Sequence, residues 1–402
     1  MTGGPGREPP SPGLRRPRRV RLLSLYPTFW PRQGGGQMVL AAIAEGLSSR
    51  LTNQVLTRRF SNTGRRKEYE FLTVHYFWNP APEVWKDYAM GIRPVSFPKK
   101  LVVTVLDIVC VLPMLRRLAL ESDLVHLHFP LPLGISALLM RLLVRRPLVV
   151  TVHGNADVYE LPPLLAPVTR AVLRRADTVV SVGRDLAEYL RSSMGVSNVT
   201  VIPNGIPVST FQMSRSTGPG LSLLSICRIV PRKNIPVLID AVERLVGEGH
   251  DLSLVIAGTG SEEEAIAQRV ARASSAIRFV GFIDEAEKRR LLMNADVFVQ
   301  LSTREGLSIA ALEALASGVP CVVSDLPGVR EPIDAGVTGW YVERPDDVDS
   351  VTATLRQVIA DRERLPEMRR ACRRVAEERY SYEAMCESYW NVFTSALGSG
   401  PR

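Results

Sequence analysis

Several features are scarce in this chain of 402 residues, and each absence excludes a class of protein. Its five cysteines are scattered and never show the CxxC spacing of a zinc site or a redox pair. No apolar run reaches the roughly 18 residues of a membrane span, because Asp107 and Pro113 interrupt the longest candidate, residues 101–115. That segment is predicted to form either a core helix or a helix on a membrane surface.

The N-terminus lacks the apolar core that follows the basic part of a secretory signal. Scattered cysteines in apolar surroundings fit a reducing compartment. We therefore expect a cytoplasmic protein. His126 and His128 share a strand face, but no carboxylate-rich strand accompanies them, so a metal site there is disfavoured. The Asp347-x-Asp349 pattern stands at a helix start, where N-capping explains it better than metal binding.

Positive charge is concentrated at one end of the chain, whose net charge is +9. Residues 1–21 contain six arginines and one glutamate, a local charge of +5, in a Pro/Gly-rich stretch. Such a segment cannot bury enough apolar surface to fold, so residues 1–18 are predicted to be a disordered tail. The mildly basic remainder favours small anionic ligands and no nucleic acid. The tail is either simply solvated or in peripheral contact with an anionic membrane on its cytoplasmic face.

Short β-branched runs alternate with helical segments, as is typical of parallel α/β sheets. Two tandem Rossmann-like, doubly wound domains are predicted, with their strand ends facing a central cleft. The expected divisions are residues 19–207 for the first domain, 208–220 for a linker, 221–382 for the second domain and 383–402 for a final helix. The predicted strands are 20–25, 54–57, 70–75, 124–128, 148–153, 178–182, 199–202, 221–227, 252–257, 277–280, 297–301, 320–324 and 339–342.

Two carboxylates, Glu305 and Glu313, stand eight residues apart where an apolar strand turns into an apolar helix. If that helix begins near Gly306, Glu313 lies inside it and Glu305 lies on the loop before it. A buried carboxylate needs hydrogen-bond donors, and ribose and sugar hydroxyls supply them. The N–H groups at the helix start suit a phosphate. Ordinary helix charges explain the same pattern.

Cations and glycines follow other strands. Arg228 and Lys233 lie on a strand-to-helix loop, from which they can converge on a diphosphate or simply face solvent. Gly34-Gly35-Gly36 after the first strand lets the backbone approach a phosphate or sugar, although a plain tight turn explains it equally well. His153, at the end of another strand, either faces the cleft or caps its own strand.

Taken in order, these pieces resemble the retaining glycosyltransferases of family four, which have the GT-B fold. The resemblance covers roughly residues 19–396. It includes the segments Asp123-Leu-Val-His-Leu-His128, Thr151-Val-His153-Gly154, Val201-Ile-Pro203-Asn204-Gly205-Ile206, Ala257-Gly258-Thr259-Gly260 and Phe279-Val-Gly281, together with the glycine turn, Arg228, Lys233 and the paired glutamates. Two positions depart from the family pattern: Leu307-Ser308 replaces Phe-Gly, and Asn234 replaces a glycine.

The resemblance implies that residues 19–207 bind the acceptor, that residues 221–382 bind the nucleotide sugar, and that the helix in 383–402 crosses back to pack on the first domain. It also implies a role for each site residue. Glu313 would hold the nucleotide ribose and Glu305 the donor-sugar hydroxyls, while His153 would lie beside the transferred sugar. Arg228 and Lys233 would neutralise the diphosphate. Backbone groups complete the donor site at Gly35, Gly36, Gly281, Gly306, Leu307 and Ser308.

The implied reaction moves a hexosyl group from a nucleotide-diphosphate sugar, with UDP expected, to a hydroxyl acceptor. It would proceed by front-face displacement without a metal or cofactor. The acceptor is a saccharide, a cyclitol, a natural product or a lipid-linked sugar, and residues 76–100, with Trp78, Trp85 and Tyr88, are expected to line its site. A sugar-nucleotide 2-epimerase and a catalytically silent sugar-nucleotide-binding subunit are the alternatives. A NAD-dependent enzyme is disfavoured because the GxGxxG fingerprint is missing.

Overall fold

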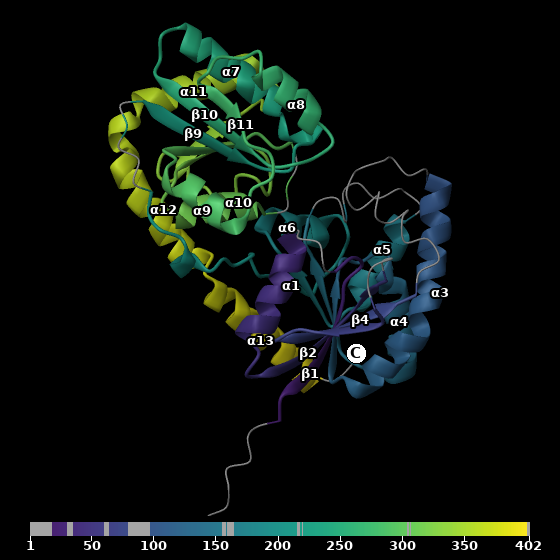
Figure 1. Ribbon diagram of the computed structural model, residues 1–402. Helices are drawn as coiled ribbons and strands as arrows, with labels where there is room; N and C mark the ends of the chain where they lie inside the picture. The colour runs from purple at the N-terminus through teal and green to yellow at the C-terminus, as the bar shows by residue number, and fades with distance from the viewer. Residues whose placement is uncertain are drawn as a thin grey trace, which may run out of the picture.

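Two parallel sheets, each covered by helices on both faces, form the described part of the chain (Figure 1). This confirms the predicted pair of Rossmann-like domains. The computed structural model describes residues 18–29, 35–59, 64–78, 97–154, 158, 165–214, 218, 220–303, 305 and 307–399. Trp85, Tyr88 and Gly306 therefore lie outside the described residues, as does most of the predicted tail.

The first sheet has the strand order β3-β4-β2-β1-β5-β6-β7-β8, and all pairs are parallel except β3 with β4. The unpredicted strand is β3, whose three residues are all charged and exposed and therefore give no apolar pattern. The strands are β1 Val20–Leu25, β2 Leu51–Arg58, β3 Arg66–Glu68, β4 Leu72–Phe77, β5 Leu124–His128, β6 Leu148–Val152, β7 Thr178–Ser181 and β8 Val199–Val201.

Helices cover both faces of this sheet, as its almost entirely apolar central strands require. The helices α3, α4, α5 and α6 contribute to the core on one face, while α1 and the last helix, α13, pack on the other. Their bounds are α1 Gly35–Gly46, α3 Phe97–Glu121, α4 Leu133–Val144, α5 Ala166–Arg175, α6 Arg184–Ser192 and α13 Tyr382–Ser399.

The charge that interrupts the apolar run of α3 has a buried partner. Asp107 and Arg58, at the end of β2, are both fully buried, and Arg58 Nη2 lies 2.6 Å from Asp107 Oδ2. Removing either partner would leave an uncompensated buried charge. The pair therefore explains how α3 carries an acidic residue on its core-facing side.

The second sheet is entirely parallel, in the order β11-β10-β9-β12-β13-β14. Its strands are β9 Leu221–Ile226, β10 Leu252–Ala257, β11 Ile277–Phe279, β12 Val297–Gln300, β13 Cys321–Ser324 and β14 Gly339–Val342. Helices α7, α8 and α11 pack on one face, and α9, α10 and most of α12 on the other. The bounds are α7 Ile235–Gly247, α8 Glu263–Val270, α9 Glu285–Met293, α10 Ile309–Ala316, α11 Val348–Ala360 and α12 Leu365–Arg379.

The chain crosses between the domains twice, and the two crossings lie side by side. Ile206 pairs with Ser381 in an isolated bridge, and the Tyr382 amide donates to the Ile206 carbonyl at 2.9 Å. Beyond the second crossing, α13 returns to the first domain, where the Tyr382 hydroxyl donates to the Ala42 carbonyl of α1 at 2.6 Å. After the first crossing, the Ser214 hydroxyl donates to the Ala295 carbonyl of the second domain at 2.6 Å.

The carboxyl edges of the two sheets face each other. The loop after β13 places both Glu331 oxygens 2.8 Å from the Arg184 amide, at the start of α6. In return, the Gly328 amide donates to Asp185 Oδ2 at 3.2 Å. Because α6 follows β7, both partners come from the strand ends at which ligands bind in open α/β sheets.

Candidate active site

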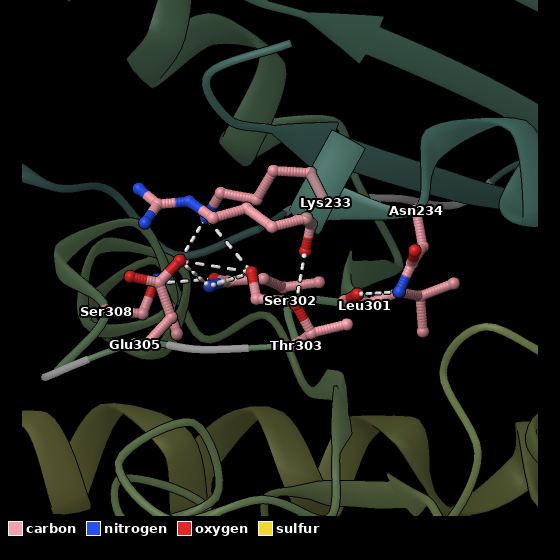
Figure 2. Close-up of polar contacts among 10 residues, drawn as sticks. Lys233, Asn234, Leu301, Ser302, Thr303, Glu305 and Ser308 are labelled. Atoms are coloured by element: carbon pink, nitrogen blue, oxygen red, sulfur yellow. Dashed lines mark hydrogen bonds and ion pairs between the residues drawn. The ribbon is translucent and has the colours of Figure 1, made fainter. Parts of the chain in front are cut away.

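A compact polar cluster lies at the carboxyl end of β12 (Figure 2). Lys233 Nζ forms an ion pair with Glu305 and donates to Ser302 Oγ at 3.0 Å. Ser302 Oγ donates in turn to Glu305 Oε1 at 3.1 Å, and Gln300 Nε2 donates to the same oxygen at 3.3 Å. The structure thus brings together Lys233 and Glu305, which the sequence analysis assigned to different parts of a donor.

Two tied loops hold this cluster in place. Lys233 ends a 3-10 turn, Pro231–Lys233, and the next residue, Asn234, adopts a left-handed conformation with φ 51°. Asparagine tolerates that region better than most residues, so it can stand where the family pattern has glycine. Its Nδ2 donates to the Leu301 carbonyl at 2.9 Å, while the Thr303 amide donates to the Arg232 carbonyl at 2.9 Å.

The helix that follows begins later than predicted. The first residue of α10 is Ile309, and Ser308 caps it by accepting the Ala311 amide on Oγ at 3.2 Å. Serine is a strong N-cap residue, which explains the shift from Gly306. Ser308 Oγ also donates to Gln300 Oε1 at 2.5 Å, so Gln300 connects the helix start to Glu305.

The buried polar residues Gln300 and Ser302 were missed by the sequence analysis. Both are fully or nearly fully buried at the end of an apolar strand. A polar residue that interrupts such a strand at its carboxyl end was the signal that could have revealed them. Leu307, predicted to contribute a backbone N–H, has a buried side chain.

Arg228 lies on the loop between β9 and Lys233. Its side chain forms no hydrogen bond or ion pair with any residue that the structure describes, in contrast to that of Lys233. Surrounding protein and then the charge of Arg232 lower the pKa of its guanidinium, while Glu305 raises it. Because a guanidinium keeps its proton in proteins, Arg228 is available to an anionic ligand.

Glu313 occupies a separate position, buried on α10 and directed toward α9. Lys288 Nζ lies 2.6 Å from Glu313 Oε1 and 2.9 Å from Glu285 Oε1. Burial raises the pKa of Glu313, and the Lys288 charge opposes that rise. Burial disfavours the charge on Lys288, yet the two carboxylates raise its pKa above the usual value. Sequence reasoning gave no signal for Lys288.

Close backbone packing shapes the loops after β9, β10 and β11. The Gly258 amide donates to the Gly281 carbonyl at 2.7 Å. Gly281 has φ 68°, and a Cβ on Gly258 would lie 1.8 Å from the Cys227 carbonyl oxygen. Only glycine fits such an approach. The predicted position Gly281 therefore belongs to a loop cluster that continues the edge carrying Arg228.

The first-domain side of the site consists of neutral rings around Gly36. A Cβ on Gly36 would lie 3.3 Å from His153 Cγ and 2.8 Å from the Tyr26 hydroxyl oxygen, so the glycine turn and His153 are in contact. Gly35 is the first residue of α1. His153 Nε2 and His128 Nδ1 share a hydrogen bond of 2.8 Å between stacked rings.

Burial keeps these histidines uncharged. It lowers the pKa of His153 to about 3, and burial followed by repulsion from His153 lowers that of His126 to about 3. The pKa of His128 is likewise held well below its usual value. His126 Nε2 lies 2.8 Å from Thr151 Oγ1, which lies 3.3 Å from the Tyr389 hydroxyl of α13. Sequence reasoning named His153 but not this network.

The predicted residues thus fall into three groups. Gly35, Gly36 and His153 lie together in the first domain, and Lys233, Glu305 and Ser308 in the second. Glu313 with Lys288 forms the third. Within the part of the chain that the structure describes, no hydrogen bond or ion pair joins the three.

Known sequence families match both halves. Residues 33–210 match Glycosyltransferase Family 4, and residues 212–379 match Glycosyl transferases group 1. The chain belongs to glycosyltransferase family 4. The two matches together span residues 33–379 of this glycosyltransferase, apart from residue 211 between them.

Individual relatives agree with the family. A phosphatidyl-myo-inositol mannosyltransferase of Mycobacterium tuberculosis is 29% identical over 294 residues, which cover 70% of this glycosyltransferase and 76% of the relative. A glycogen synthase of the same organism is 29% identical over 232 residues, or 56% of each chain.

Solved structures confirm the GT-B fold. Sucrose-phosphate synthase from Thermosynechococcus elongatus superposes with a TM-score of 0.79 at 17% identity, covering 95% of this chain and all of the other. The Anabaena protein HepE in complex with UDP-glucose gives a TM-score of 0.72 at 17% identity, covering 94% and 100%.

Proposed function

We propose that this glycosyltransferase moves a hexosyl group from a UDP-sugar to a hydroxyl acceptor, with retention of configuration at the anomeric carbon. The observation that carries the proposal is the cluster of Lys233 and Glu305 beside Arg228, at the strand edge that faces the first domain. Cations suit the diphosphate, and a carboxylate that accepts from several donors suits sugar hydroxyls.

Lys233 and Arg228 would stabilise the charge that develops on the leaving phosphate. Lys233 is paired with Glu305 when no ligand is bound, and it donates a second hydrogen bond to Ser302 Oγ. An arriving diphosphate would share the lysine, because one ammonium can donate three hydrogen bonds. Arg228 brings a second positive charge that no described residue neutralises. Such preorganised charge is the largest source of rate in many transfer reactions.

Retention would follow from attack on the face from which the diphosphate leaves. The bond between the anomeric carbon and the phosphate oxygen breaks as the bond to the acceptor oxygen forms, and the phosphate oxygen takes the acceptor proton. Glu305 supports this course because its pairing with Lys233 makes it a poor nucleophile. Neutral His153 can hydrogen-bond a sugar hydroxyl without adding charge beside the oxocarbenium-like centre.

The two cations also support a metal-independent reaction. They would neutralise the negative charge of the leaving diphosphate, as a divalent cation does in other reactions with a phosphate leaving group. We expect full activity in excess EDTA. A loss of activity that magnesium restores would contradict this part of the proposal.

The acceptor is proposed to be a polyol: a saccharide, a cyclitol or a lipid that carries one. One relative is named for acting on phosphatidyl-myo-inositol and another for making glycogen, and both acceptors present sugar-like hydroxyls. Trp78, at the end of the described part of the expected acceptor segment, exposes 62% of its surface and could stack on such a ring.

A screen for thermal stabilisation by UDP-, GDP- and ADP-sugars tests the donor, since a ligand that binds the folded state raises the melting temperature by mass action. The preferred donor is then incubated with candidate polyols, and the product's anomeric configuration is read by NMR. An α-linked product from an α-linked donor is expected. Epimerised donor without transfer would indicate a 2-epimerase, and binding without turnover a silent subunit.

A further inference from the structure

We propose that the outer faces of α3 and α4 dock the protein on an anionic lipid bilayer. Eight of the 14 large hydrophobic side chains that are exposed in the described residues lie on these two helices. Six of them, exposed between 44% and 78%, are Val102, Val105, Val109, Leu139, Leu142 and Leu143. Such a concentration on a folded protein marks an interaction surface, whereas single exposed apolar residues do not.

The spacing of these residues places them in one stripe on each helix. Val102, Val105 and Val109 follow i, i+3 and i+7, while Leu139 and Leu142 lie three apart on α4. The opposite sides of both helices pack into the sheet core. Each stripe therefore faces away from the protein.

The two helices are side by side, and the α4 stripe lies further toward the C-terminal end of α3 than the α3 stripe. α3 and α4 run in the same direction, because Ser136 Oγ donates to the Ile108 carbonyl and, further along, Arg146 Nε donates to the Ala119 carbonyl, at 3.3 and 3.4 Å. Both helices lie along the outer side of the first domain, away from the second (Figure 1). The exposed apolar residues of the two helices therefore extend along one outer side of the domain, where they can meet a flat partner.

Charge distinguishes a bilayer from a protein partner. The two helices end at arginines on the same side, Arg116 and Arg117 on α3 and Arg145 after α4, and these form no ion pair with any described residue. The acidic residues of α3 are buried Asp107 and Glu121 in its last position, and α4 has none. Aliphatic residues flanked by arginines are typical of helices that lie in a membrane interface.

A cation-lined cavity adjoins the arginine end of this surface. It has a volume of about 430 Å³ and lies beside the beginnings of β1 and β6. Arg18, Arg19, Arg145 and Arg146 line it, together with Asp123. A lipid phosphate beside this cavity would meet several positive charges, each of which strengthens binding to an anionic surface.

A protein partner fits this surface less well. Binding hot spots are enriched in tryptophan and tyrosine, whereas valine and leucine are under-represented. The sequences of α3 and α4 contain neither aromatic residue. The described residues contain no helix able to cross a membrane, so the contact would be peripheral.

The test is sedimentation of the full-length protein with vesicles of phosphatidylcholine, with or without phosphatidylglycerol. The wild type should sediment with the anionic vesicles and lose this binding at high salt. Combined Val105→Asn, Val109→Asn and Leu142→Asn substitutions should weaken binding at least about tenfold, because three inserting side chains become polar. The matched control is Phe282→Asn in the second domain, where the side chain is 78% exposed and binding should not change.

Three results would overturn the proposal. The wild type could fail to bind anionic vesicles, or the triple variant could bind as well as the wild type. Alternatively, light scattering could show a wild-type dimer that the triple variant abolishes, which would make this face a self-association surface. Arg15→Gln with Arg16→Gln separates the two basic regions, because we expect this tail variant to retain most of the binding. Unchanged melting temperatures, expected for exposed positions, would show that the variants fold.

Discussion

The two sides of the site differ in the charge of their side chains. On the first-domain side, His126 and His128 are fully buried, His153 is partly buried, and all three are neutral. His128 and His153 share a hydrogen bond, while His126 hydrogen-bonds to Thr151. On the second-domain side, Lys233 and Glu305 form a charged pair near Arg228, and Lys288 and Glu313 form a second pair at a separate position. Under the proposed function, the charged part of the donor would bind the second domain. The uncharged side would then contact the sugar, where a fixed charge would disturb the reacting centre.

The largest effect should come from removing a cation on the charged side. Lys233→Met deletes the donor to the leaving phosphate and leaves Glu305 without its partner, so kcat should fall on the order of 10²-fold. Initial-rate kinetics with the preferred donor measure this. Arg232→Met is the control, because this neighbouring residue hydrogen-bonds to the cluster only through its carbonyl, and its kcat should stay within a few-fold of the wild type. Equal losses in both variants would show that the loop is merely structural.

Glu313 and Lys288 should affect nucleotide binding more than transfer. Glu313→Gln removes the charge that would accept ribose hydroxyls, and the affinity for UDP should fall roughly tenfold. Lys288→Met should weaken UDP binding too, and the double variant should lose less than the sum, since the residues are in contact. Calorimetric titration with UDP and 2′,3′-dideoxy-UDP measures the hydroxyl contribution. Undiminished discrimination in Glu313→Gln would remove the ribose assignment.

The neutral histidines of the first domain should make the stability of the protein depend on pH. His126 and His153 have folded-state pKa values of about 3, below the ordinary 6.5, so the unfolded chain binds more protons between these values. The contribution of these histidines to the free energy of unfolding is therefore fully present above about pH 6.5. It declines as the pH falls toward 3, by up to roughly 1.4 kcal/mol per pH unit for each group. Melting temperatures of His126→Phe should show a shallower decline.

The contact between the two sides should have the smallest effect. Glu331 accepts the Arg184 amide of α6 through both oxygens, and it joins strand-end loops of the two domains. Glu331→Ala should lower kcat only two- to threefold, because losing one partly exposed hydrogen bond costs about 1 kcal/mol or less. Glu363→Ala, on an exposed turn of the second domain, serves as the control. A loss as large as that of Lys233→Met would mean that domain apposition, rather than charge, limits the reaction.

Much of the fold could be predicted from the sequence, because short apolar runs, either alternating or continuous, mark the strands of parallel sheets. It failed at β3, where the charged run Arg66–Glu68 pairs only at a sheet edge. The late start of α10 was missed because the Ser308 cap competes with the glycine two residues earlier.

The candidate site could be predicted only in part. Residues on loops after strands, such as Lys233 and Glu305, are recognisable from their position and charge. Lys288 is not, because it reaches Glu313 from a different helix and only the packing of α9 on α10 brings them together. Gln300 and His128 stand within apolar strands, where their hydrogen bonds depend on neighbouring loops that no local pattern specifies.

The most direct test compares the affinities of UDP and uridine by titration calorimetry. If the charged side binds the diphosphate, UDP should bind much more tightly than uridine to the wild type. In Lys233→Met combined with Glu305→Gln, which removes the pair together, that advantage should shrink about tenfold or more while uridine binding stays unchanged. An unchanged ratio of the two affinities, or an equal loss for both ligands, would contradict the assignment of the diphosphate to this cluster.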